Sequence, residues 1–185
     1  MELFEFLMIL LSIIVGLGLA ELLTGIAIIL REERQSQFSW IHGAVVLAIF
    51  LALLQTFWES WGLQGVPEWT FPAMLLMLSS PILLFVIAHI LFPAGTHHDS
   101  LGDYYFERAR LIWTIALITV IVSSLFRPLA FGMPLFVMDN ASSIPSLVIC
   151  MLLITIRNRK FHYDLVPFVP LTIAIDTLAV NYLIR

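Results

Sequence analysis

Residues 3–30 read LFEFLMILLSIIVGLGLAELLTGIAIIL, an apolar run that carries the carboxyl group of Glu21 deep inside it. A membrane-spanning helix needs about 20 apolar residues, so this run predicts a first transmembrane helix. A charged side chain near the centre of such a helix costs about 2.5–3.5 kcal/mol on insertion scales. We therefore expect Glu21 to face protein or water, which places this helix inside a larger bundle.

The composition of the whole chain agrees with a membrane location. Hydrophobic residues make up 61% of the 185 residues, charged residues 12%, and the mean hydropathy is +1.00. Soluble domains contain about 45–50% apolar and about 25% charged residues. The net charge of −4 comes without a large basic cluster, so nucleic acid is not an expected partner. The single cysteine, Cys150, excludes a disulfide framework.

Apolar runs and polar connections divide the chain into six expected helices. The predicted fold is an all-α integral membrane protein, a bundle of six transmembrane helices with short loops, because helices satisfy their own backbone groups in lipid. It forms a single transmembrane domain over residues 1–185. The expected helices cover about 3–30, 39–61, 71–92, 109–126, 141–156 and 165–184.

The basic residues predict the orientation of this bundle. Seven of the nine Lys and Arg residues fall in the connections one-two, three-four and five-six: Arg31, Arg34, Arg108, Arg110, Arg157, Arg159 and Lys160. The other two, Arg127 and Arg185, fall on the opposite side. The positive-inside rule then makes the three basic connections cytoplasmic and both termini extracytoplasmic, in a cell (inner) membrane.

Small residues mark the faces on which the first two helices are expected to pack. Gly18, Glu21 and Gly25 share one face of the first helix, and Gly16 lies on the opposite face. Small residues allow close helix approach in lipid, so we expect this helix to be buried on two faces, one of them against an axis or a neighbouring subunit. The second helix carries a stripe of small residues at Ala44, Ala48 and Ala52.

Four charged groups are candidates for transport or gating. The stripe on the second helix becomes polar at Glu59, at the same outer depth as Arg127, which predicts an ion pair that acts as a brace or an outer gate. Asp176 lies near the middle of the sixth helix, where it cannot reach the membrane surface. Glu21 and Asp176 are therefore the preferred path residues. The alternative is that each carboxyl group only hydrogen-bonds to a neighbouring helix.

The histidines suggest proton handling, with weaker alternatives. All five fall in the predicted cytoplasmic half, and histidine titrates near physiological pH, which favours His42 and His89 as proton carriers. These two also lie at similar depth on consecutive helices, an arrangement that could hold a b-type haem. A structural hydrogen bond is the plainer alternative. His97-His98-Asp99 lacks repeated metal-binding boxes, so no metal or cofactor is predicted.

The sequence favours transport over catalysis. It contains neither a GxSxG nucleophile elbow nor an HExxH zinc motif. We expect an oligomeric membrane channel or transporter for a proton, ion or small solute, assembled from copies of this chain within membrane lipid. One alternative is a non-catalytic scaffold or sensor subunit that binds a soluble cytoplasmic partner through residues 104–108 and 157–160. A second is a b-haem or quinone-linked membrane protein.

Overall fold

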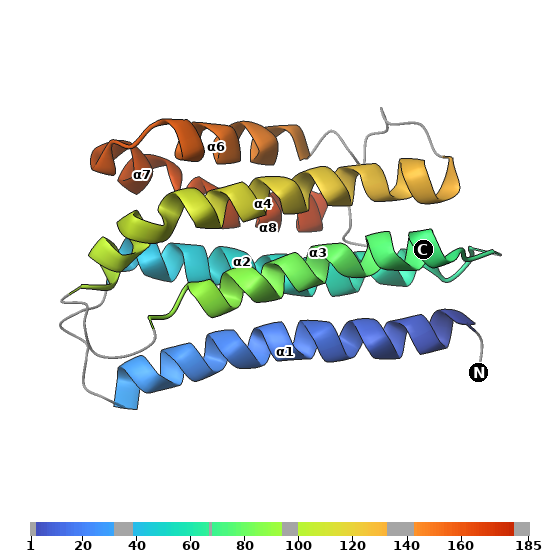
Figure 1. The fold of residues 1–185 in the computed structure, drawn as a ribbon. Coiled ribbons are helices and arrows are strands. Elements are labelled where there is room, and N and C mark those ends of the chain that lie inside the picture. The colour runs from blue at the N-terminus through green and yellow to red at the C-terminus, as the bar shows by residue number, and fades with distance from the viewer. Residues whose placement is uncertain (1–2, 32–38, 67, 94–99, 133–142, 180–185) are drawn as a thin grey trace.

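The computed structural model describes residues 3–31, 39–66, 68–93, 100–132 and 143–179. Every regular element in these ranges is helical, as Figure 1 shows. The α-helices are α1 (Leu3–Arg31), α2 (Trp40–Ser60), α3 (Phe71–Ile90), α4 (Leu101–Phe131), α6 (Ser143–Thr155), α7 (Arg159–Leu165) and α8 (Phe168–Ala179). A short 3₁₀ turn, η2 (Trp61–Leu63), extends α2.

Four of the described helices are long and apolar enough to cross a membrane: α1, α2 with η2, α3 and α4. The shortest of them, α3, has 20 residues, which at about 1.5 Å per residue matches the hydrocarbon thickness of about 30 Å. The expected all-α fold is confirmed for the described residues, and these four helices are consistent with the expected membrane location. In the described residues α6 has 13 and α8 has 12, so a fifth and a sixth crossing stay predictions.

The expected start of the fourth helix at Ala109 is wrong. α4 begins at Leu101, where the Ser100 hydroxyl accepts a hydrogen bond from the Gly102 N–H at 3.1 Å. It ends beyond the expected residue 126, at Phe131, where Gly132 adopts the left-handed conformation (φ 65°) that often closes a helix. Charged side chains had suggested a boundary near Ala109, but they mark the membrane surface, and the helix continues past it.

The expected sixth helix from Leu165 is also wrong at its start. The chain forms the short helix α7 first and begins α8 only at Phe168, with Pro167 between them. Asn158 caps α7 by accepting a hydrogen bond from the Lys160 N–H at 3.0 Å. The basic turn therefore leads directly into a short helix. Residues 141–142 and 180–184 of the last two expected helices lie outside the described residues.

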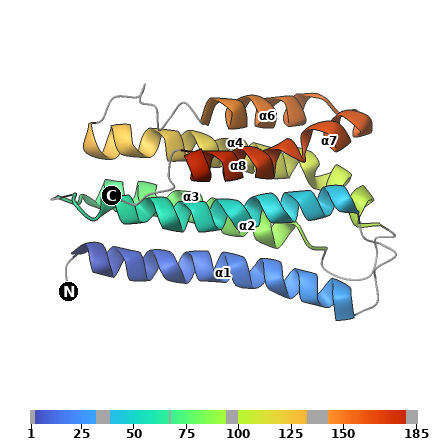
Figure 2. The ribbon, with the colours of Figure 1, turned by 180° about the vertical axis from the view of Figure 1, so that it is seen from behind.

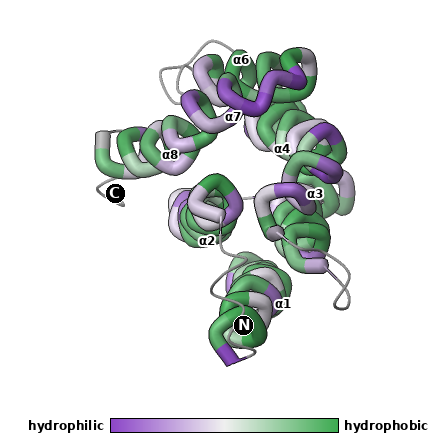
Figure 3. The backbone as a smooth tube through the Cα atoms, turned by 90° about the vertical axis from the view of Figure 1, so that its left-hand side faces the viewer, coloured by the Kyte–Doolittle hydropathy of each residue, from purple (hydrophilic) through white to green (hydrophobic). Residues whose placement is uncertain are grey.

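The helices form one bundle in which α1 lies at the edge. α1 packs on α2 and α3, α4 packs on α3, and the two shorter helices lie along the longer ones, α6 on α4 and α8 on α2 (Figures 1 and 2). The end view in Figure 3 shows α1 at one side of the bundle and α6 at the other. The expectation that two faces of α1 are buried is met within this chain for one face only, the face of Gly18 and Gly25.

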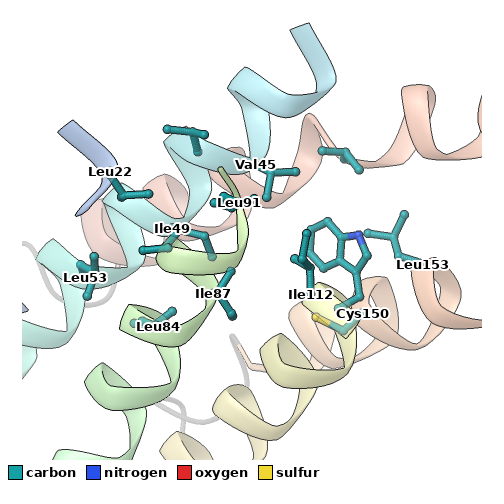
Figure 4. Close-up of a cluster of buried hydrophobic side chains, with 14 of the residues drawn as sticks. Leu22, Val45, Ile49, Leu53, Leu84, Ile87, Leu91, Ile112, Cys150 and Leu153 are labelled. Carbon is teal, nitrogen blue, oxygen red and sulfur yellow. The ribbon is translucent and has the colours of Figure 1, made fainter. Parts of the chain in front are cut away.

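A continuous apolar core joins these helices. Figure 4 shows Leu22 of α1, Leu53 of α2 and Ile87 of α3 on one side, with Ile112 of α4 and Leu153 of α6 on the other. All five side chains are almost completely buried. Because lipid tails are as apolar as these side chains, close van der Waals packing is what favours the association of helices in a bilayer.

The end of α3 is tied to its neighbours by two side chains. The last carbonyl groups of a helix lack partners within the helix. The Nε2 of His42, on α2, hydrogen-bonds the Leu91 carbonyl at 2.8 Å, and the Tyr104 hydroxyl, on α4, donates to the Ile90 carbonyl at 2.8 Å. The end of α1, the start of α4 and the α6–α7 turn lie at this same end of the bundle, on the left in Figure 1. The described basic residues from the three predicted cytoplasmic connections therefore share one end.

Candidate functional site

A cavity of about 240 Å³, partly open to the outside, lies between α2, α3, α4, α6 and α8. One part of its wall is apolar and includes Ile49, Leu84 and Ile112. Another part carries the charged and amide groups, which come from three helices: Gln55 and Glu59 of α2, Arg127 of α4 and Asp176 of α8. A largely apolar cavity with a few convergent polar groups is the usual form of a small-molecule site.

The stripe on α2 forms one wall of this cavity. Ala48, Ala52, Gln55 and Glu59 recur at spacings of three and four residues, so they share one face of the helix. Because the side chains of Ala48 and Ala52 are small, they leave space for the cavity beside this face of α2. The sequence had predicted only that they allow neighbouring helices to approach. Ala44 does not line the cavity and packs at the edge of the apolar core.

Gln55 connects the two carboxyl groups of the cavity. Its Nε2 donates to Glu59 Oε1 at 2.8 Å, one turn along the same helix. The same nitrogen donates to Asp176 Oδ2, on a helix 121 residues away in sequence. An amide nitrogen carries two hydrogens, so it can serve both acceptors. The two carboxyl groups are therefore held close together, where a positive group would be attracted to both.

The second oxygen of Asp176 is the polar atom of the cavity that needs a partner. Oδ1 is buried and makes no hydrogen bond with any residue that the structure describes. A buried acceptor without a donor costs about 1–3 kcal/mol. A solute that brings an N–H or O–H group to this atom would remove that cost.

Arg127 and Glu59 line the same cavity. A guanidinium nitrogen of Arg127 lies 3.9 Å from the position that a Cβ at Gly62 would take, so this side chain reaches the end of α2 just beyond Glu59. The structure thus brings both members of the predicted ion pair to one region. The ion pair itself stays a prediction.

Several lining residues were missed by sequence reasoning. The hydroxyl groups of Ser80, on α3, and Ser123, on α4, lie 2.8 Å apart and join these helices beside the cavity. Ser143, Ser146 and Cys150 line it from α6. Their spacing of three and then four residues puts them on one helix face, a pattern that was present in the sequence and could have indicated the site.

Glu21 and His89 form a separate pair between α1 and α3. His89 Nδ1 lies 2.8 Å from Glu21 Oε1. The side chains are 35% exposed for Glu21 and 71% exposed for His89, and neither lines the cavity. Glu21 does contact protein, but the structure does not bring it together with Asp176.

The packing glycines of α1 differ from one another. A Cβ added at Gly25 would overlap the ring of Phe92, and one at Gly18 would lie 3.0 Å from Leu53. Both positions therefore allow the close approach that the sequence predicted. A Cβ at Gly16 would meet nothing within 4 Å in this chain.

The two histidines proposed as haem ligands have different partners. His42 is buried and bonded to the Leu91 carbonyl, whereas His89 is exposed and paired with Glu21. The contact through Nδ1 leaves Nε2 of His89 available, whereas His42 would have to break its Nε2 contact with Leu91 before that nitrogen could bind a haem iron. Within the described ranges no three His, Cys, Asp or Glu side chains are grouped to hold a metal ion. His97, His98 and Asp99 lie outside these ranges.

A buried hydrogen-bond chain leads from the cavity to the basic end of the bundle. Trp113, which lines the cavity, donates from Nε1 to the Tyr105 hydroxyl at 2.9 Å. That hydroxyl lies 2.8 Å from His162 Nδ1, and His162 Nε2 lies 2.9 Å from the Ile156 carbonyl. A neutral imidazole with its proton on Nε2 satisfies all three contacts. Burial lowers the pKa of His162, which favours this neutral form.

One part of the expected docking surface, residues 104–108, is wrong for its two tyrosines. Tyr104 is 7% exposed and Tyr105 is fully buried, so these two residues are not available to a soluble partner. Glu107 and Arg108 are exposed. The two tyrosine side chains instead point into the bundle, where the Tyr104 hydroxyl donates to the Ile90 carbonyl and the Tyr105 hydroxyl accepts from Trp113.

No protein-family model, curated protein or solved structure matches this chain.

Proposed function

We propose that this chain is a membrane transporter or channel for a small solute that carries a positive charge or several hydrogen-bond donors. The observation that supports this proposal is the Gln55 bridge between Glu59 and Asp176, together with the buried Oδ1 of Asp176, for which the described residues supply no donor. Intramembrane carboxyl groups that face the interior of a bundle commonly mark ion and solute pathways.

The residues of the cavity have distinct proposed roles. Asp176 and Glu59 attract the positive group of the solute, and Gln55 keeps both carboxyl groups in place. Arg127 braces the charged region or gates it, while Ile49, Leu84 and Ile112 contact the apolar part of the solute. The volume of about 240 Å³ suits a small molecule, since a water molecule takes about 30 Å³ in the liquid. Glu21 and His89 lie outside this path.

Six crossings and an oligomeric state belong to the same proposal. α6 and α8 run between the two ends of α4 and α2, and we propose that each forms a crossing with the residues that flank it. Both termini then lie on the extracytoplasmic side of the inner membrane, because the basic end faces the cytoplasm. Homo-oligomers form through the edge of the bundle, where α1 leaves room for a second copy beside Gly16.

A flux measurement in liposomes tests the path. Proteoliposomes containing a trapped pH-sensitive dye would be given gradients of protons, of methylammonium and, with a protonophore that exchanges protons for the entering cation, of K⁺ in turn. We expect flux of at least one of these probes, and a decrease of about tenfold or more in Asp176→Asn, since a hydrogen bond to a charged group contributes about 1.5–3 kcal/mol. Thr177→Val is the matched control, because Thr177 bonds its own helix backbone and does not line the cavity.

Equal flux in wild type, Asp176→Asn and Gln55→Leu would contradict the path. A parallel loss in Thr177→Val would show that α8 is merely sensitive to substitution. Absence of flux for every probe, in protein that is shown to be folded, would contradict transport of small cations.

A further inference from the structure

A second hollow, of about 420 Å³, opens at the basic end of the bundle where α4, α6 and α7 meet. Its apolar surface comes from Phe106 of α4 and from Leu153 and Ile154 of α6. Its positive charge comes from three arginines on three different segments: Arg110 of α4, Arg157 after α6 and Arg159 of α7. The cavity in the bundle interior shares none of these residues.

The three arginines are not equivalent. Arg159 is fixed by an ion pair with Asp103 at 2.8 Å and lies over the Phe106 ring, 4.8 Å from its centroid. With the residues that the structure describes, the guanidinium groups of Arg110 and Arg157 form no hydrogen bond or ion pair. Among the described residues that line the hollow, Glu107 is the one acidic residue, and it has interactions of its own. The hollow therefore has an excess of positive charge, with two arginines available to an anion.

The chemistry of guanidinium groups restricts which anion fits. A guanidinium presents several N–H donors in one plane and pairs well with the oxygens of a phosphate. Two such groups on separate segments can bind different oxygens of one phosphate. The apolar surface beside them suits a ligand that also carries hydrocarbon.

The sequence places the hollow at the boundary of the membrane. Arg110 is the last charged residue of α4 before the uncharged run 111–126. Arg157 is the first charged residue after α6. Both arginines therefore lie where an apolar helix leaves the bilayer, which is the level of lipid head groups.

We propose that this hollow binds the phosphate head group of an anionic phospholipid. Arg110 and Arg157 contact the phosphate oxygens, while Arg159, which is paired with Asp103, lines the hollow beside Phe106. The acyl chains lie on the outer surface of α4 and α6, both of which expose large apolar side chains such as Leu111 and Leu152. Basic pockets at this level between membrane helices are known to suit acidic lipid head groups.

Native mass spectrometry of the full chain in detergent, with added lipid, tests the proposal. Phosphatidylglycerol should remain bound, and phosphatidylcholine should not. The double variant Arg110→Gln/Arg157→Gln should weaken binding of phosphatidylglycerol by about fivefold for each arginine, the effect of one basic residue near an anionic membrane surface. Lys160→Gln is the matched control, because it removes one charge from the same turn without lining the hollow.

Three results would overturn the proposal. One is unchanged phosphatidylglycerol binding in the double variant. Another is equal retention of phosphatidylcholine by the wild type. The third is binding of glycerol 3-phosphate as tight as that of the lipid, which would identify the ligand as a soluble phosphate ester. Arg110→Lys/Arg157→Lys keeps the charge and guards against misfolding, and it should bind with intermediate affinity.

Discussion

At the scale of single residues, Gln55 determines the character of the interior cavity. Its amide joins Glu59, which is local, to Asp176, which is distant in sequence. The sequence predicted both carboxyl groups as candidates because charges in apolar helices are costly. Their connection could not be predicted, because it depends on the rotation of α8 against α2.

His162 leads to a prediction about pH. Burial lowers the pKa of its imidazole in the folded protein below the usual value of 6.5, which it regains in the unfolded chain. As the pH falls below 6.5 the unfolded chain therefore binds a proton first, and stability decreases. Protonation of the folded form would also make both ring nitrogens donors, which is incompatible with an O–H bond from Tyr105.

Thermal unfolding in detergent at about pH 7.5 and about pH 5.5, on either side of the free histidine pKa, measures this effect. The wild type should lose more stability over this interval than His162→Gln. An equal loss in both proteins would assign the pH dependence to other groups.

At the scale of elements, the lengths of the helices and the positions of their glycines explain where the helices extend and how closely they pack. α4 has 31 residues, or about 46 Å at 1.5 Å per residue, which exceeds the hydrocarbon thickness of about 30 Å. Its charged first turns therefore extend beyond the bilayer, and hydropathy alone set its start too late. Of the two faces of α1 that were expected to be buried, the structure buries the face of Gly18 and Gly25, and burial of the Gly16 face stays a prediction.

Gly25 and Gly16 offer a matched pair of substitutions on α1. Gly25→Ala places a methyl group against the Phe92 ring and should lower the free energy of unfolding by about 1–3 kcal/mol, as overpacking of a core does. In protein that is monomeric in detergent, Gly16→Ala has open space within its own chain and should be neutral, or stabilising by about 0.5–1 kcal/mol, because alanine favours the helix. Thermal unfolding of both variants checks this, and equal effects would contradict the observed orientation of α1.

At the scale of the whole molecule, the shared basic end is the feature that connects structure with membrane topology. The end of α1, the start of α4 and the α6–α7 turn lie together, and the α2–α3 turn lies at the opposite end (Figure 1). Because the chain returns to the basic end after α4, α6 must run back along the bundle. This arrangement supports the proposed crossings at α6 and α8.

Cysteine labelling tests that topology. In a Cys150→Ala background, Gly65→Cys lies in the turn after η2 and Lys160→Cys lies in α7. A membrane-impermeant maleimide should label Gly65→Cys in intact cells, and Lys160→Cys only after the membrane is permeabilised, because basic segments stay in the cytoplasm. Labelling of both from outside would exclude a crossing by α6, and the reverse pattern would invert the orientation.

The apolar runs of the sequence were enough to predict a helical membrane protein, and the positions of the arginines and lysines predicted which basic residues share one end. These properties depend on the local density of apolar side chains and on segment length, which can be read from a single stretch. The hydrogen bond from Gln55 to Asp176, the contact between Glu21 and His89, and the burial of Tyr105 became visible only in the folded bundle. These contacts depend on how each helix is rotated and on which helices lie beside it. Both are set by side-chain packing across the entire bundle and not by any one segment.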